Sequence, residues 1–454
     1  MPTISRVLVA NRGEIAVRII RACKALGIGT VVTVSEADKD SLAARLADRA
    51  VCIGGPRPGE SYLNIEAIVA AARGTGADAV HPGYGFLAER RRLADACHEN
   101  GLIFVGPPGE VIEKMGNKIE ARIIAERCGV PIVPGSDKVR SVADASEVAA
   151  RIGYPLLLKA AAGGGGRGMR IVIEESGLRS AFESAAAEAG AAFGDDTIYI
   201  ERYIRHARHI EVQIIGDKHG NLVHLGERDC SSQRRYQKII EEAPAPFLDS
   251  LRSRIHEAAL KLAREVRYEN AGTIEFIVDR DADEFYFLEM NTRIQVEHPV
   301  TEMITGIDIV QEQLRVAAGA PLSFRQEDIR FWGHSIECRV NAESARDGFR
   351  PSPGRITVWR SPEGPQIRID THCAAGYLVP PYYDSMLAKV IVHAPDRMAA
   401  IILLERALSE MVVEGVSTTI PFVAKVIAKP DFRDGQTHVR WIEELLAQFP
   451  DTVN

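Results

Sequence analysis

The sequence predicts a parallel α/β domain at the start of the chain and a mixed α+β structure after it. Over about residues 1–115, short apolar strands alternate with amphipathic helices, as in a parallel sheet covered by helices. From about residue 204 the strands become longer, and two of them flank a short polar turn, as in a hairpin. These two observations divide the chain into at least two structural parts.

The N-terminal part begins with a strand followed by a helix. The helix is predicted from about Gly13 to Leu26, because Ile15, Ile19 and Ala22 fall on one face and Gly27 can end it. Strands are predicted at residues 6–10, Thr30–Val34, Ala77–Val80 and Leu102–Val105.

The composition is that of a soluble globular protein with two to four subdomains. The chain has 454 residues and a net charge of −7, which argues against general binding to nucleic acid. Its seven cysteines are scattered and form no C-x-x-C pair, which predicts reduced thiols in a cytoplasmic protein. The first residues lead directly into a strand and no long apolar run follows, so neither a signal peptide nor a membrane span is expected.

The densest group of chemically active residues runs from Glu289 to His298, directly after the apolar segment Phe285–Leu288. Polar groups this dense are costly in a core, because each buried one needs a partner. Glu289 and Asn291 have the same parity, so on an extended strand their oxygens point to the same side. Oxygen ligands suit Mg²⁺ or Mn²⁺ better than zinc. The alternative is a polar strand edge with surface ion pairs.

Neighbouring strands bring more polar groups to this region. Segments 273–278 and 285–288, with the polar turn between them, are predicted to form a hairpin that brings Glu275 close to Glu289. Two adjacent carboxylates repel unless a cation or proton separates them, so a shared metal ion is the simplest interpretation. The alternative is an exposed charged strand face. The strand at residues 208–215 turns a polar side towards a ligand or solvent: His209, Glu211 and Gln213.

A glycine run, Gly163–Gly166, lies between two apolar segments and is preceded by Lys159. A P-loop or a dinucleotide fingerprint would open a helix after such a run, and neither pattern is present. The expected structure is strand, mobile loop, strand. Such a loop can fold over a triphosphate, with backbone N–H groups as donors and Lys159 and Arg167 adding charge. Glycine runs also serve as linkers, which is the alternative here.

Five blocks of the sequence resemble the biotin carboxylases, a family of ATP-grasp enzymes. The blocks are Asn11–Ala16, His81–Leu87, the glycine run through Met169, Glu227–Arg235, and Glu289–Met303. The resemblance implies a Rossmann-like N-terminal domain at 1–116, an ATP-grasp domain at 117–330 with a mobile glycine-rich lid at about 131–203, and a biotin carboxylase C-terminal domain at 331–446. The family's biotinyl acceptor motif, Ala-Met-Lys-Met, is absent. The chain is therefore similar to a free-standing subunit that acts on biotin carried by another protein.

The resemblance also implies a reaction. ATP phosphorylates bicarbonate to carboxyphosphate, which breaks down to CO₂ and phosphate, and the deprotonated ureido nitrogen of biotin attacks CO₂. Glu297 would be the base for bicarbonate, Lys238 and Arg293 would hold the anions, and Arg339 would stabilise charge on the ureido oxygen. For Glu297 and Arg339 the alternative is a structural ion pair. The remaining residues implied for bicarbonate and biotin are Gln295, Val296 through its backbone, and Tyr84.

By the same resemblance, Mg²⁺ or Mn²⁺ would be bound by Glu275, Glu289 and Asn291. The residues implied for ATP are Lys118, Lys159, Gly165, Gly166, Glu201, Arg202, Tyr203, Ile204, His209 and Tyr236. His209 could equally be a structural residue of its strand. Tyr236 departs from the family, which commonly has His there, and a tyrosine carries no positive charge near neutral pH.

The implied partners are a biotin carboxyl carrier protein and carboxyltransferase subunits, and a homodimer is expected. Acetyl-CoA is the default acceptor, which would place the chain in fatty acid biosynthesis; pyruvate and propionyl-CoA are the alternatives. Two other hypotheses are an ATP-grasp ligase that joins a carboxylate to an amine and a non-catalytic ATP-binding assembly subunit. The ligase would not require Lys238, Glu297 and Arg339 together, and all three are present. An assembly subunit would be indicated by loss of the metal ligands or of Glu297, and neither is lost; Tyr236 is the only residue that favours it.

Overall fold

The first part of the molecule is a five-stranded parallel sheet in the order β3-β2-β1-β4-β5. The computed structural model describes residues 4–136, 138–160, 169–193, 196–248 and 250–448. The strands are β1 (Arg6–Val9), β2 (Gly29–Val34), β3 (Arg49–Cys52), β4 (Ala79–His81) and β5 (Ile103–Phe104). The connecting helices are α1 (Gly13–Ala25), α2 (Leu42–Leu46), α3 (Ile65–Thr75) and α4 (Arg91–Glu99). The predicted parallel α/β domain is confirmed. Strand β3 was not predicted, because it is a largely exposed edge strand without an apolar run.

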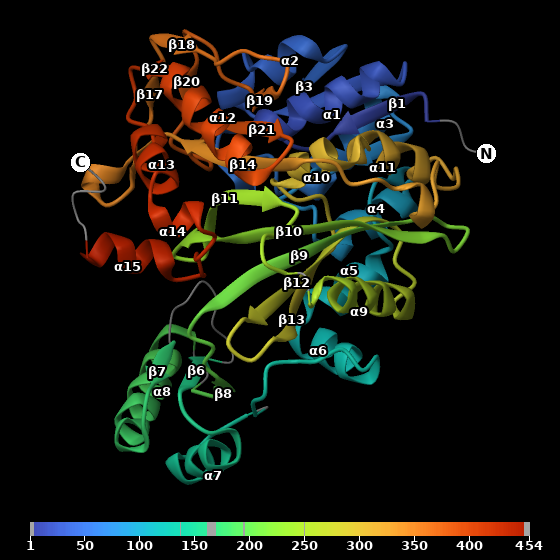
Figure 1. Ribbon diagram of the computed structural model, residues 1–454. Coiled ribbons are helices and arrows are strands. Elements are labelled where there is room, and N and C mark those ends of the chain that lie inside the picture. Colours follow the sequence, from blue (N-terminus) through green and yellow to red (C-terminus); the bar gives the residue numbers. More distant parts are fainter. Residues whose placement is uncertain (1–3, 137, 161–168, 194–195, 249, 449–454) are drawn as a thin grey trace.

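The second part is built on an eight-stranded antiparallel sheet in the order β13-β12-β9-β10-β11-β14-β21-β19. Its strands are β9 (Ala207–Gly216), β10 (Leu222–Arg234), β11 (Gln237–Ala243), β12 (Asn270–Asp279), β13 (Glu284–Asn291), β14 (His334–Asn341), β19 (Ile367–Thr371) and β21 (Met386–Ala394). Figure 1 shows β9 and β10 crossing the middle of the molecule, with β14 and β21 above them. Strands from before and after residue 330 therefore share one sheet.

A smaller body projects from the sheet at the lower left of Figure 1. It contains a three-stranded antiparallel sheet in the order β7-β6-β8 and two helices. The elements are β6 (Leu156–Ala160), β7 (Arg170–Val172), β8 (Ile198–Arg202), α7 (Val142–Ile152) and α8 (Leu178–Phe193). Strands β6 and β7 pair as the predicted hairpin, whereas the glycine loop that joins them, residues 161–168, lies outside the described residues.

Helices pack against the apolar side of the central strands, whereas the opposite side of β9 carries buried polar residues. The apolar side of β9, formed by Ile210, Val212 and Ile214, packs in a core with α5 (Gly109–Gly116), α6 (Lys118–Arg127) and α9 (Arg252–Glu265). The other helices are α10 (His298–Thr305), α11 (Ile309–Ala317), α12 (Arg397–Glu410), α13 (Ile420–Ile427), α14 (Pro430–Arg433) and α15 (Trp441–Gln448). Short two-stranded sheets are formed by β15 (Glu343–Ser344) with β16 (Arg350–Pro351), β17 (Gly354–Arg355) with β20 (Leu378–Val379), and β18 (Val358–Arg360) with β22 (Val412–Glu414).

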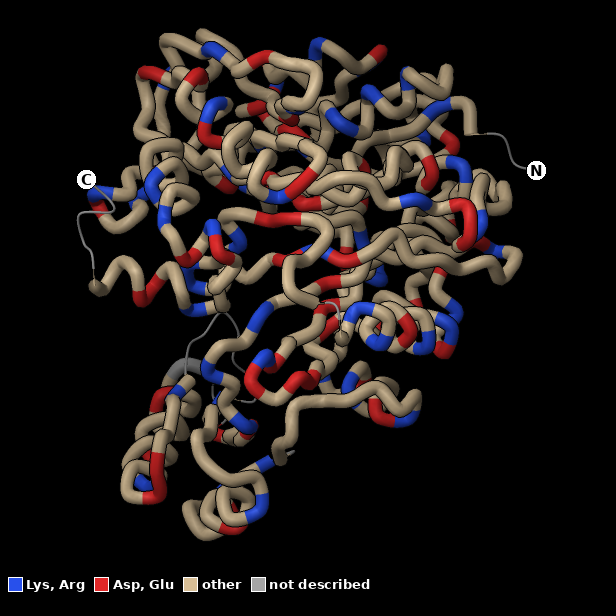
Figure 2. The backbone as a smooth tube through the Cα atoms, in the orientation of Figure 1, with Lys and Arg blue, Asp and Glu red and all other residues tan. Residues whose placement is uncertain are grey.

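Charged residues of both signs are distributed over the whole molecule. Figure 2 shows lysines and arginines interspersed with aspartates and glutamates along the chain. Some of the acidic residues lie in the central strands, where Glu211, Glu241 and Glu275 are buried. This mixture differs from the basic stripe typical of nucleic-acid-binding domains. No described helix is both long and apolar enough to span a bilayer.

Candidate active site

The centre of the site is Lys238 on β11, whose ammonium group contacts three carboxylates from three segments. Its Nζ lies 2.6 Å from Glu211 Oε2 on β9, 3.0 Å from Glu275 Oε1 on β12 and 2.6 Å from Glu297 Oε1 just before α10. All three carboxylates are buried. Burial lowers the pKa of Lys238, but the three carboxylates outweigh it and hold the pKa well above its usual range. Lys238 therefore remains charged and holds the cluster together.

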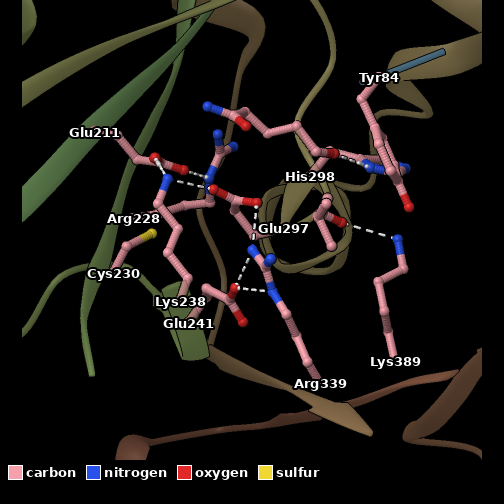
Figure 3. A network of polar contacts seen from close by, with 12 residues as sticks. Tyr84, Glu211, Arg228, Cys230, Lys238, Glu241, Glu297, His298, Arg339 and Lys389 are labelled. Atoms are coloured by element: carbon pink, nitrogen blue, oxygen red, sulfur yellow. Dashed lines mark hydrogen bonds and ion pairs between the residues drawn. The ribbon is translucent and has the colours of Figure 1, made fainter. Parts of the chain in front are cut away.

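Arg339, on β14, contacts the other oxygen of Glu297. Its Nη2 lies 3.1 Å from Glu297 Oε2, and its Nε donates to Glu241 Oε1 at 2.6 Å. Figure 3 shows Glu297 between Lys238 and Arg339. Burial alone would raise the pKa of Glu297, yet the nearby Lys238, Arg339 and Arg228 hold it well below its usual range. The ion pair considered for Glu297 and Arg339 is thus present.

The polar side of β9 is buried, so it does not open to solvent. His209 Nε2 lies 3.0 Å from Glu275 Oε2, and His209 Nδ1 lies 2.8 Å from Gln233 Nε2. Arg228 on β10 is fully buried and donates to Glu211 and to Gln213. Two opposite charges buried side by side need additional hydrogen bonds, and Arg228 makes them by donating to the hydroxyl oxygens of Thr301 and Thr273. These buried groups contact Lys238 through Glu211 and Glu275, to which Arg228 and His209 respectively bind.

The β12–β13 hairpin is confirmed, and Glu275 pairs directly with Glu289 across it. The next pair is Phe276 with Phe287, so Leu288 is an extra residue that forms a β-bulge. The bulge changes which side of the strand faces the core, because one added residue reverses the alternation. As a result Phe287 packs in the core while Glu289 faces the site.

The predicted metal ligands fit a divalent cation such as Mg²⁺. Burial raises the pKa of Glu289, and the adjacent Glu275 raises it further. The nearest cation to Glu289 is the exposed Lys118, with Nζ 3.6 Å from Oε2. Asn291 Nδ2 donates to Glu275 Oε1 at 2.9 Å, and Glu275 is the residue that pairs with Glu289 across the hairpin. The charge of Glu289 is thus only partly neutralised by Lys118. A carboxylate of this kind with other oxygen donors near it is the ligand set that Mg²⁺ prefers.

Arg293 is held at the edge of the same cluster. Its Nε donates to Glu89 Oε2 at 2.8 Å, its Nη1 to Gln295 Oε1 at 2.7 Å and its Nη2 to Asn291 Oδ1 at 3.0 Å. Gln295 Nε2 also donates to Glu275 Oε1 at 3.2 Å. The structure thus places the predicted anion-binding residues beside the predicted metal ligands.

The described residues expected to bind ATP come from α6, from the smaller body and its connection to β9, and from the central sheet. Lys159 on β6 pairs with Glu201 on β8, and Arg122 on α6 pairs with the other oxygen of Glu201. Despite burial, these two cations lower the pKa of Glu201. Lys118 begins α6 and is exposed. Gly165 and Gly166 lie outside the described residues.

The segment after Glu201 joins the smaller body to β9. Arg202 contacts Tyr286, Asp279 and Glu284 near the hairpin turn, and the Tyr203 hydroxyl accepts from Arg440 at 3.3 Å. Ile204 is buried against Val133, Ala207 and Tyr286. This connection, residues 201–204, is called the hinge below; it contacts β13 on one side and the residue before α15 on the other.

Tyr236 lies at the tip of the β10–β11 turn and is 60% exposed. Arg235 and Tyr236 both have positive φ values, 49° and 62°, between the paired residues Arg234 and Gln237. A two-residue hairpin turn of this type favours Asn and Gly, so these residues are strained. Tyr236 reaches Met169, with the hydroxyl 3.9 Å from the sulfur.

Tyr84 lies on the opposite side of Glu297 from Lys238 (Figure 3). Its hydroxyl donates to Glu14 Oε1, which also contacts Lys389 Nζ at 3.1 Å. Lys389 is fully buried on β21 and donates to the carbonyl of Val296 at 2.8 Å. Tyr84 is therefore more than a loop aromatic, because it is linked through two charged residues to the segment that carries Glu297.

Several residues of the cluster were not predicted as site residues: Glu14, Glu89, Arg228, Glu241 and Lys389, together with Glu211, whose direct contact with Lys238 was not foreseen. Glu14 and Arg228 lie within quoted motifs and Glu89 lies two residues after one, so proximity to a motif is the signal that could have identified them. Glu241 and Lys389 lie in strands that are far apart in sequence and are brought together only by the sheet register.

Three family models match the chain. They are described as biotin carboxylase, N-terminal domain (residues 3–112), carbamoyl-phosphate synthase L chain, ATP binding domain (117–325), and biotin carboxylase C-terminal domain (337–444). The chain belongs to the biotin carboxylase family. It is an ATP-dependent ligase that uses ATP, Mg²⁺ and biotin.

Relatives of similar identity differ in the carboxylase that they serve. The chain is 52% identical to a pyruvate carboxylase subunit from Methanothermobacter thermautotrophicus, covering 97% of this chain and 90% of the relative. It is 51% identical to biotin carboxylase 1 of Bacillus subtilis, covering 97% and 98%. A solved structure of the biotin carboxylase domain dimer of the 2-oxoglutarate carboxylase from Hydrogenobacter thermophilus, in complex with MgADP, ADP and bicarbonate, is 49% identical with a TM-score of 0.91, covering 100% and 99%. The relatives thus include proteins named for pyruvate carboxylase and for 2-oxoglutarate carboxylase as well as for biotin carboxylase alone.

Proposed function

We propose that this biotin carboxylase acts on biotin held by a separate carrier protein and that Glu297 is its base for bicarbonate. The observation that carries the assignment is the position of Glu297 between Lys238 and Arg339, beside the carboxylates of the β12–β13 hairpin. A ligase that joins a carboxylate to an amine has no need for this arrangement of base and cations.

In the proposed first step, bicarbonate binds between Lys238 and Arg293 with Gln295 and the Val296 N–H as further donors. The anion competes with Glu297 for Lys238, which frees the carboxylate to accept the bicarbonate proton. A bicarbonate oxygen then attacks the γ-phosphorus of ATP, ADP leaves and carboxyphosphate forms. Burial of the cluster strengthens these charge interactions, because little water competes with them.

In the proposed second step, carboxyphosphate breaks into CO₂ and phosphate, and phosphate takes the proton from the ureido nitrogen of biotin. That nitrogen attacks CO₂, and Arg339 stabilises the negative charge on the ureido oxygen. The contact of Arg339 with both Glu241 and Glu297 fixes its guanidinium in place before biotin arrives. Tyr84 lines the biotin side.

The ATP side of the proposal assigns metal and nucleotide contacts. Mg²⁺ held by Glu275, Glu289 and Asn291 would neutralise charge on the phosphates. Lys118 and Lys159 would contact the phosphates, and the backbone of Gly165 and Gly166 would close over them. The adenosine part would meet the residues of the hinge and the two adjacent strands: Glu201, Arg202, Tyr203, Ile204, His209 and Tyr236. Lys159 would exchange its contact with Glu201 for the phosphates.

We propose the domain limits 1–116, 117–330 and 331–446, which the ranges of the three family models support. The proposed partners are a biotin carboxyl carrier protein and carboxyltransferase subunits. Homodimer formation is supported by the Hydrogenobacter thermophilus domain dimer. Seven free cysteines support a reducing, cytoplasmic location.

Acetyl-CoA is the proposed final acceptor, which implies a role in fatty acid biosynthesis. A second candidate class is a 2-oxo acid, because relatives of equal similarity belong to pyruvate and 2-oxoglutarate carboxylases. The acceptor would be chosen by the carboxyltransferase partner. Purification of the native complex, followed by transfer of labelled carboxyl groups to acetyl-CoA, propionyl-CoA, pyruvate and 2-oxoglutarate, separates these candidates.

The function is tested by ATP hydrolysis with Mg²⁺ and labelled bicarbonate, with and without free biotin. We expect biotin to stimulate hydrolysis and to become labelled. ATP binding without biotin-stimulated turnover, even after addition of a biotinylated carrier, would instead support a non-catalytic assembly role.

A further inference from the structure

Two buried side chains hold consecutive carbonyl groups in the segment that carries Glu297. His298 Nδ1 lies 2.8 Å from the carbonyl oxygen of Gln295, and Lys389 Nζ lies 2.8 Å from the carbonyl oxygen of Val296. Both side chains are fully buried. A carbonyl can only accept, so His298 must carry its proton on Nδ1 in this contact.

These contacts set the direction of two backbone N–H groups. In a planar trans peptide, the C=O and the following N–H point in opposite directions. The contact from His298 therefore fixes the N–H of Val296, and the contact from Lys389 fixes the N–H of Glu297. Figure 3 shows Lys389 and Lys238 on opposite sides of Glu297, so an N–H directed away from Lys389 points towards the Lys238 side. Within the described part of the chain, neither amide has a hydrogen-bond acceptor.

We propose that His298 and Lys389 are positioning residues, which hold the peptides on either side of Val296 so that two backbone N–H groups face the anion site. The inference rests on the proposed function, in which the Val296 N–H is a donor to bicarbonate. A pair of preorganised backbone donors stabilises an anion without the cost of reorienting them during the reaction.

The charges around the two side chains suit this task. Burial lowers the pKa of His298 well below the usual range, and the charges of Lys389, Arg18 and Arg368 lower it further; Asp370 opposes this shift, and Glu302 Oε2 lies 3.9 Å from Nε2. It therefore stays neutral, with one N–H available for the carbonyl. Lys389 contacts Glu14 Oε1 at 3.1 Å and approaches Asp370 Oδ2 at 3.8 Å.

Lys389 also links the proposed biotin side of the site to the proposed bicarbonate side. Glu14 accepts from both Tyr84 and Lys389, so the residue lining the biotin side and the peptide beside Glu297 share one carboxylate. A displacement of Lys389 would disturb both sides of the reaction.

The first test replaces His298 in two ways. His298→Leu removes the donor, whereas the side-chain amide of His298→Asn can place an N–H near the position of Nδ1. We expect the Leu variant to raise the KM for bicarbonate by about tenfold, because it weakens about one hydrogen bond from the backbone to the bicarbonate anion. The KM for ATP should change little. The Asn variant should recover most of the loss. Equal KM values for bicarbonate in the two variants would overturn the inference.

The second test removes Lys389. Because Lys389→Met alone leaves Glu14 without a cation, Glu14→Gln/Lys389→Met is made beside it. Both should raise the KM for bicarbonate. Arg397→Met is the control, since it breaks another buried pair, Arg397 with Glu242, that does not contact residues 295–297. A similar rise of the bicarbonate KM in Arg397→Met would show that general destabilisation is the cause and would overturn the inference.

One readout is independent of turnover. In protein with ¹⁵N-labelled histidine, His298 should show the neutral Nδ1–H tautomer between about pH 6 and 9. The Nε2–H tautomer would overturn the inference even if the enzyme is active. Absence of bicarbonate-dependent turnover in the wild-type protein would instead count against the proposed function, and the tautomer would still test the contact with Gln295.

Discussion

Lys238 Nζ lies 2.6 Å from Glu297 Oε1, so the carboxylate proposed as a base is paired directly with a cation. Arg339 occupies its other oxygen. A carboxylate whose pKa is held this low is a poor base until an anion draws the cations away. Bicarbonate itself is such an anion, so the geometry couples activation of the base to binding of its substrate.

Replacement of Glu297 by Gln should separate binding from chemistry. The amide keeps the shape of the side chain but cannot accept the bicarbonate proton. We expect bicarbonate-dependent ATP hydrolysis to fall by about 10²–10⁴-fold, with the Kd for ATP nearly unchanged. Steady-state kinetics and nucleotide titration measure the two quantities. Full activity in the variant would exclude Glu297 as the base.

Replacement of Arg339 by Ala should affect biotin more than ATP. Arg339 is the cation proposed to meet the ureido oxygen, and its loss should slow biotin carboxylation by about 10²–10³-fold. Slow ATP turnover without biotin should fall much less. Glu241→Gln is a useful companion, because it removes the charged partner of Arg339 and leaves the guanidinium in the site. Equal losses of both activities would mean that Arg339 organises the whole cluster.

The parallel sheet, the β12–β13 hairpin and the nearness of Glu275 to Glu289 could all be predicted from the sequence. Local alternation of apolar and polar residues is sufficient for these elements. The bulge at Leu288 could not be predicted, because nothing in the run Phe285–Leu288 marks an extra residue. The alternation of side chains correctly placed Glu289 and Asn291 on the same side of the strand. Because of the bulge at Leu288, that side faces the site and not the core.

The partners of the site residues were harder to predict than the residues themselves. Glu241 reaches Arg339 because β11 pairs with β14, across about a hundred residues of sequence. Lys389 pairs with Arg339 across β14 and β21 and contacts the carbonyl of Val296, about ninety residues earlier in the sequence. Long-range register of this kind leaves no local pattern in the sequence. The sequence therefore indicated which groups do chemistry, and the sheet determines which charges support them.

Replacement of Glu289 by Gln should weaken the metal site without removing it. The change deletes one carboxylate charge beside Glu275 and leaves Glu275 and Asn291 in place. We expect the Mg²⁺ concentration for half-maximal activity to rise by about tenfold or more, with partial recovery at high Mg²⁺. Glu257→Gln, which removes an exposed carboxylate paired with Lys261 on α9, is the control. An unchanged Mg²⁺ requirement would show that Glu289 is not a ligand.

The pH dependence of folding stability should reveal the protonation of Glu337. This carboxyl group is buried, and neither of its oxygens has a hydrogen-bond partner among the described residues. Burial raises its pKa well above the usual range, and the charge of Glu241, its partner across β11 and β14, adds to the shift. The folded protein thus keeps a proton that the unfolded chain loses at about pH 4.3. Stability should therefore fall as the pH rises from there through the folded-state pKa.

Glu337→Gln should remove this pH dependence, because the amide mimics the protonated carboxyl group. Relative to the wild type, the melting temperature of the variant should improve between about pH 6 and 9, by about 1–3 °C. Glu312→Gln is the control, since the oxygens of Glu312 accept from Ser323 and Arg315. Loss of this carboxylate should lower the melting temperature at both ends of the range, about pH 6 and about pH 9. A constant difference between Glu337→Gln and wild type across this range would mean that Glu337 carries no proton in the folded protein.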